Sequence, residues 1–69
     1  MTVDELKTHL CELIARYVTD EVAKERLLHL VERDDVPVKG ILVELTPFTS
    51  GRVSEEDGKV IGEIAYYFC

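Results

Sequence analysis

The stretch VKGILVELT, residues 38–46, decides which fold class the sequence predicts. It is nearly continuous in apolar and β-branched residues, and Pro47 follows it directly. If side chains alternate between two faces, one face carries Ile41, Val43 and Leu45. A short apolar run of this composition that ends at a proline is typical of a buried strand. We therefore expect a β-strand over residues 38–46.

A second stretch of the same character, KVIGEIAYYFC, ends the chain at residues 59–69. Its branched and aromatic residues predict a strand over residues 60–68. Residues 47–59 then form a loop that is longer than most hairpin loops, which favours a functional or mobile segment. Within this loop, Ser54 could cap a single helical turn.

The first half of the chain has the apolar spacing of two amphipathic helices, at residues 2–18 and 20–34. Thr2 and Glu5 have the three-residue spacing of a capping box, which marks the start of the first helix. The second helix has to end before Pro37. Because the link between the two helices is very short, they are expected to form an antiparallel hairpin.

Together these segments predict a single α+β domain over residues 1–69, with element order ααββ and the helix hairpin packed on two antiparallel strands. Both faces of the strands carry apolar residues, and a two-layer monomer covers only one of them. We therefore expect a homodimer that shares or stacks its sheets. The residues predicted at this dimer interface are Ile61, Tyr67 and Cys69.

The charge of the chain limits its possible partners. Fourteen acidic residues against eight basic ones give a net charge of −6, which argues against direct binding to nucleic acid or to an anionic membrane. With 46% hydrophobic residues the chain is expected to fold. No signal peptide or membrane-spanning run is evident, and two cysteines do not make a disulfide scaffold. We expect a cytoplasmic protein with reduced thiols.

The sequence contains no recognisable catalytic or metal-binding motif. His9 and Cys11 are two residues apart on a predicted helix, so their side chains point to different sides. Paired CxxC spacing, HExxH and a glycine-rich phosphate loop are all missing. We expect no enzyme activity, no cofactor and no metal site.

The acidic residues in the second half of the chain suggest a protein-binding function. A small rigid body that displays carboxylates can occupy a basic surface of a larger protein. The predicted partner-binding residues are Asp34, Asp35, Glu55, Glu56 and Asp57, with Phe48 as an aromatic anchor beside Tyr67. The expected partner is a larger protein with a basic or apolar patch.

In size and charge, the chain resembles the small inhibitor proteins of phages and mobile elements, including anti-restriction and anti-CRISPR proteins. This resemblance implies an inhibitor or modulator of a larger protein, and it assigns no role to any residue. Two alternatives remain open. One is a structural or assembly subunit of a larger complex. The other is a small-ligand or metal sensor with a site at a dimer seam, near Cys69 and His29.

Overall fold

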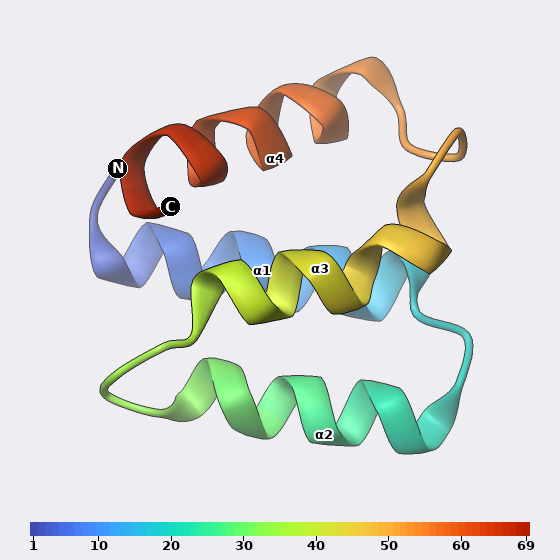
Figure 1. Ribbon diagram of the computed structural model, residues 1–69, viewed down its shortest axis with the longest axis horizontal. Helices are drawn as coiled ribbons and strands as arrows, with labels where there is room; N and C mark the ends of the chain where they lie inside the picture. Colours follow the sequence, from blue (N-terminus) through green and yellow to red (C-terminus); the bar gives the residue numbers. More distant parts are fainter.

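The computed structural model describes residues 1–69 and contains four helices and no strand. The helices are α1 (Val3–Tyr17), α2 (Glu21–Glu32), α3 (Val38–Thr49) and α4 (Glu55–Phe68), as Figure 1 shows. The predicted α+β fold with element order ααββ is therefore wrong. Both predicted strands are helices, and the predicted loop at residues 47–59 contains the end of α3 and the start of α4.

Helices α1 and α2 each begin at a side chain that caps the helix, and for α1 it is the capping box that the sequence predicted. The Thr2 hydroxyl accepts the Glu5 N–H, and the Glu5 carboxylate accepts the Thr2 N–H, which completes the capping box. The Asp20 carboxylate caps α2 by accepting the N–H groups of Val22 and Ala23. The two helices run in opposite directions, side by side (Figure 1).

Helix α3 shows why the strand prediction failed. Val38, Ile41 and Leu45 are buried at helical spacing, whereas Val43 is 64% exposed. A strand would have placed Val43 on the same face as its two buried neighbours. In a run that is almost entirely apolar, a period of 2 and a period of 3.6 both fit the sequence. The helix prevails because it forms its own backbone hydrogen bonds, which an isolated pair of strands only partly does.

Helix α4 starts where the sequence predicted a single helical turn. The Ser54 hydroxyl accepts the Asp57 N–H at 3.1 Å, and three acidic residues occupy the positively polarised first turn. The helix then continues to Phe68. Along it, Ile64 is fully buried and Tyr66 is 80% exposed, so the alternation expected of a strand is absent.

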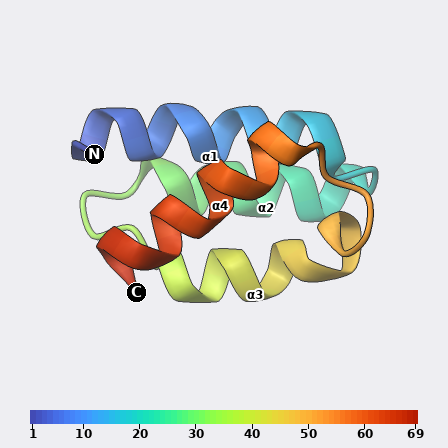
Figure 2. The same ribbon diagram turned by 90° about the horizontal axis from the view of Figure 1, so that it is seen from above.

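The core lies between the four helices, and α1 contacts each of the other three. Helix α4 crosses obliquely above α1 and α3 (Figure 2). None of the four helices is both long and apolar enough to cross a membrane. The buried core residues are Leu6, Leu10, Leu13, Ile14, Val18, Leu27, Val31, Val38, Ile41, Leu45 and Ile64.

The absence of a sheet also corrects the predicted dimer, because there are no strands to share or stack. Ile61 is half-buried against the core, whereas Tyr67 and Cys69 are exposed near the end of α4. These three residues do not form the continuous apolar sheet face that the prediction assumed.

Candidate protein-binding groove

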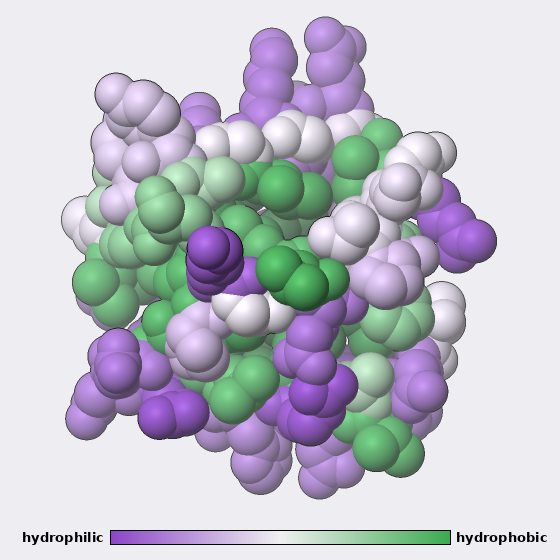
Figure 3. All heavy atoms as spheres, in the orientation of Figure 1, coloured by the Kyte–Doolittle hydropathy of each residue, from purple (hydrophilic) through white to green (hydrophobic).

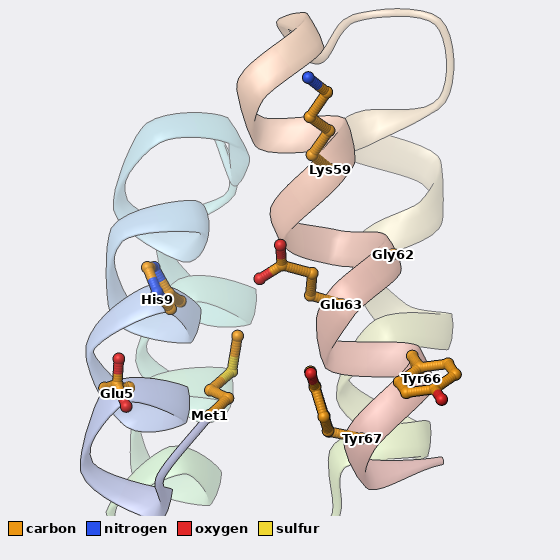
Figure 4. Close-up of a pocket in the computed structure, with 8 residues that line it drawn as sticks. All are labelled: Met1, Glu5, His9, Lys59, Gly62, Glu63, Tyr66 and Tyr67. Atoms are coloured by element: carbon orange, nitrogen blue, oxygen red, sulfur yellow. The ribbon is translucent and has the colours of Figure 1, made fainter.

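The largest hollow of the surface lies between α1 and α4 and has a volume of ≈ 490 Å³. In Figure 4, His9 and Met1 on one side and Glu63 and Tyr67 of α4 on the other project into this space. A smaller hollow of ≈ 190 Å³ also lies between the two helices, toward the start of α4, and shares His9 with the first. We call the two hollows together the α1–α4 groove.

At the start of α4, a buried carboxylate fixes this helix to the end of α1. Asp57 is only 9% exposed, and Arg16 Nη1 donates to both of its carboxylate oxygens at 2.7 Å. The Tyr17 hydroxyl donates to Asp57 Oδ2 at 2.5 Å and accepts the Ser54 N–H at 3.2 Å. Hydrogen bonds from Arg16 and then from Tyr17 hold the pKa of Asp57 below its usual range, and the same carboxylate raises the pKa of Arg16.

The other carboxylates of the groove are free to meet a partner. Glu5, Glu12, Glu56 and Glu63 are all exposed, and none of them belongs to an ion pair within the chain. One oxygen of Glu5 accepts the Thr2 N–H, which lowers the pKa of Glu5. Lys59 also lines the groove without an ion pair, and Arg16 is bound by Asp57, so four unpaired carboxylates face one free ammonium group and the groove is acidic.

Two adjacent tyrosines stand at the end of α4. The rings of Tyr66 and Tyr67 meet edge to face, with centroids 5.0 Å apart. Tyr67 is 57% exposed and projects into the groove (Figure 4), and Tyr66 also lines the groove. Exposed aromatic side chains of this kind are common anchors of protein interfaces. One end of the acidic groove therefore has an aromatic wall.

The acidic residues that the sequence proposed as one binding surface do not lie together. Asp34 and Asp35 belong to the link between α2 and α3, at the left in Figure 1, whereas Glu55 and Glu56 begin α4 at the opposite end. Of this set, Glu56 lines the groove as a free carboxylate. The carboxylate of Asp57 is bound by Arg16 and Tyr17 of the same chain.

Phe48 lies on α3, away from the groove, and is half-buried against the core. Hydrophobic side chains gather near the middle of the face in Figure 3, and hydrophilic ones stand at its upper and lower edges. Val43 is the large hydrophobic side chain of α3 that is most exposed. Phe48 is thus not part of the acidic groove.

Sequence reasoning did not identify Glu5, His9, Glu12 and Glu63 as site residues. The first three recur every three or four positions along α1, so they share one side of that helix, and this signal was present in the sequence. The opposite wall could not be anticipated. As long as residues 60–68 were expected to form a strand, Glu63 had no reason to face α1.

The structure offers no support for a metal or catalytic site at the cysteines and histidines. No three His, Cys, Asp or Glu side chains are grouped so that they could hold a metal ion. His29 lines only shallow hollows made by residues of α2, and Cys69 lines none. Burial, and then the carboxylates of Glu32 and Glu12, raise the pKa of the Cys11 thiol, which makes it a poorer nucleophile.

Comparison of the chain with protein-family models, with curated proteins and with solved structures found no match.

Proposed function

We propose that this protein is a small acidic module that binds a basic segment of a larger protein in the α1–α4 groove. By covering that segment, it would inhibit or modulate the partner. The observation that carries this proposal is the set of four free carboxylates, Glu5, Glu12, Glu56 and Glu63, along one groove.

The groove suits the side chains of arginine and lysine in two ways. Carboxylates on both walls would pair with the cationic groups of the partner, and such pairs direct association and set the register of binding. The ring of Tyr67 at one end offers a surface over which a cation or an aliphatic stem can lie. A basic segment that binds nucleic acid has this chemistry, so the protein would compete with nucleic acid for it.

The Arg16–Asp57 pair supports the proposal by keeping the two walls in place. It joins α1 to α4 across 41 positions of sequence and neutralises the one arginine in the groove. The groove is therefore formed before a partner arrives, which lowers the entropic cost of binding.

Site-specific photo-crosslinking tests this proposal in cells that naturally express the protein. A photoreactive phenylalanine analogue replaces His9 in the groove or, as a control, Val22, which is 78% exposed on α2. We expect a discrete adduct with one protein from position 9 and none from position 22. Equal adducts from both positions would show that the groove is not the binding site.

A matched pair of double variants then separates the groove from the overall charge. Glu12→Gln with Glu56→Gln removes two groove carboxylates, and Glu25→Gln with Glu32→Gln removes two from α2. Both variants have the same net charge. We expect the adduct from position 9 to be lost only in the first variant. Equal losses in both would mean that the protein binds through its total charge and not through the groove.

A further inference from the structure

The α4 wall of the groove has an ordered charge pattern. Lys59 lies three residues after Glu56 and four before Glu63, so the three side chains stand on one side of the helix. Along the helix axis, Lys59 is about 4.5 Å from Glu56 and about 6 Å from Glu63. All three residues are exposed, and none of them forms an ion pair within the chain. In Figure 4, the ammonium group of Lys59 extends toward the start of α4, away from Glu63. The wall therefore offers a partner an acid, a base and an acid in succession.

The α1 wall of the groove repeats this order. His9 lies four residues after Glu5 and three before Glu12, and it lines both hollows of the groove. A histidine ring carries at least one N–H donor in either protonation state, so His9 can donate to an acceptor, as Lys59 can. His9 likewise belongs to no ion pair within the chain. Each wall is therefore acidic at two places and offers a hydrogen-bond donor between them.

We propose that the groove binds a helix of the partner in which two basic residues, seven positions apart, flank one acidic residue on the same side. This inference rests on the proposed function, and it names the form and the charge order of the bound segment. The two bases pair with the carboxylates of a wall. The acid, at the third or fourth position after the first base, pairs with Lys59 or His9. Lys59 is then the residue of the α4 wall that selects for the central acid.

Helix geometry favours a helical occupant over an extended one. Residues seven apart on a helix are separated by about 10.5 Å along the axis, which is also the separation of Glu56 and Glu63 on α4. The third or fourth position of the occupant then falls between them, near Lys59. In an extended chain, side chains on one face recur about every 6.6 Å, so three successive ones span roughly 13 Å and the outer two overshoot the acids. A second helix therefore matches the charges of the wall in register, as the charged edges of paired helices do.

Lys59 also disfavours an occupant that is basic throughout. A row of lysine or arginine residues would place a cation beside the ammonium group of Lys59, and like charges that meet at an interface reduce affinity. The net charge of −6, in contrast, favours a more basic segment over one of mixed charge. Total charge and charge order therefore predict opposite preferences between two occupants, and this difference can be measured.

Two alanine-based helical peptides serve as probes, and fluorescence anisotropy at low salt measures their dissociation constants with the full chain. The first peptide has two arginines seven positions apart and a glutamate four positions after the first arginine. The second has lysine in place of that glutamate. We expect the wild type to bind the first peptide about tenfold more tightly, because a contact between opposite charges replaces one between like charges.

Variants of the protein assign this preference to Lys59. Lys59→Glu should reverse the preference, so that the lysine peptide binds more tightly than the glutamate peptide. Lys39→Glu is the matched control, since it makes the same change of charge at an exposed position of α3, and it should leave the preference unchanged. A third peptide, with proline in place of one alanine between the arginines of the first, does not form the helix and should lose most of its affinity.

The opposite results separate this inference from the proposed function. Tighter binding of the lysine peptide by the wild type would overturn the charge order, and an unchanged affinity of the proline peptide would overturn the helical form. In both cases the proposed function would stand if Glu12→Gln with Glu56→Gln weakened peptide binding. Binding that this double variant leaves unaffected would lie outside the groove and would contradict the proposed function as well. If neither helical peptide binds, the inference is overturned, and photo-crosslinking from position 9 decides the proposed function separately.

Discussion

Gly62 provides a direct test of the helix that replaces the second predicted strand. It lies in the middle of α4, is exposed, and has open space where a side chain would begin. Glycine is about 1 kcal/mol less favourable than alanine inside a helix, and nothing in the surroundings opposes an added methyl group. Gly62→Ala should therefore stabilise the protein by about 1 kcal/mol, which raises the Tm by roughly 4–8 °C in a domain of this size.

Gly62→Val makes the test specific for secondary structure. Valine loses side-chain freedom in a helix and is about 0.6 kcal/mol less favourable there than alanine, so the valine variant should melt below the alanine variant. In a strand the order would be reversed, because valine is favoured over alanine on a scale that spans about 1 kcal/mol.

Thermal and urea unfolding followed by far-UV circular dichroism gives the order of the three proteins. The measurements are made at low protein concentration, so that self-association does not contribute. We expect the stability order alanine, then valine, then glycine. If the valine variant were the most stable of the three, residues 60–68 would not form a helix.

Three further predictions concern the core, the ion pair and the end of α3. Leu10→Ala, at a fully buried position of α1, should cost about 2–5 kcal/mol and lower the urea midpoint accordingly. The pKa of Asp57 is lower in the folded state than in the unfolded state, where it is about 3.9. The Arg16–Asp57 ion pair therefore stabilises the protein fully above a pH of about 3.9. This contribution to stability is lost as the pH falls through the folded-state pKa of Asp57. Melting curves of Asp57→Asn should therefore differ from those of the wild type at neutral pH and converge with them in acid; a difference independent of pH would contradict this. Pro47 lies inside α3, where alanine is more favourable than proline by roughly 3 kcal/mol. Alanine also gives the unfolded chain more conformational freedom, which costs about 1 kcal/mol of stability. Pro47→Ala should therefore raise the free energy of unfolding by up to about 2 kcal/mol. An unchanged or lower Tm for that variant would argue against a helix there.

The helix starts were the part of the fold that local sequence specified best. Thr2 and Ser54 each accept a backbone N–H group at the start of a helix, at the positions that the sequence suggested. Capping depends on a few residues that are close in sequence, so it can be recognised without knowledge of the tertiary structure. For the segment after Ser54, the start was recognised but the length of the helix was not.

The candidate groove was much less predictable. The sequence identified the acidic character of the chain and three residues that line the groove, Glu56, Asp57 and Tyr67. It grouped Glu56 with Asp34 and Asp35, which the structure places at the other end of the molecule. A groove between two helices depends on which helices are neighbours, and that information is not local.

What the sequence determined by itself was the set of properties that depend on composition or on close neighbours: the net charge, the capping residues and the amphipathic character of α1 and α2. What only the tertiary structure decided was the secondary structure of residues 38–46 and 60–68. The groove between α1 and α4 depends on that choice. Nearly continuous apolar runs allow both helix and strand locally. The choice depends on packing. As helices, these segments bury Ile41, Leu45 and Ile64 in the common core, while their backbone groups form hydrogen bonds within each helix.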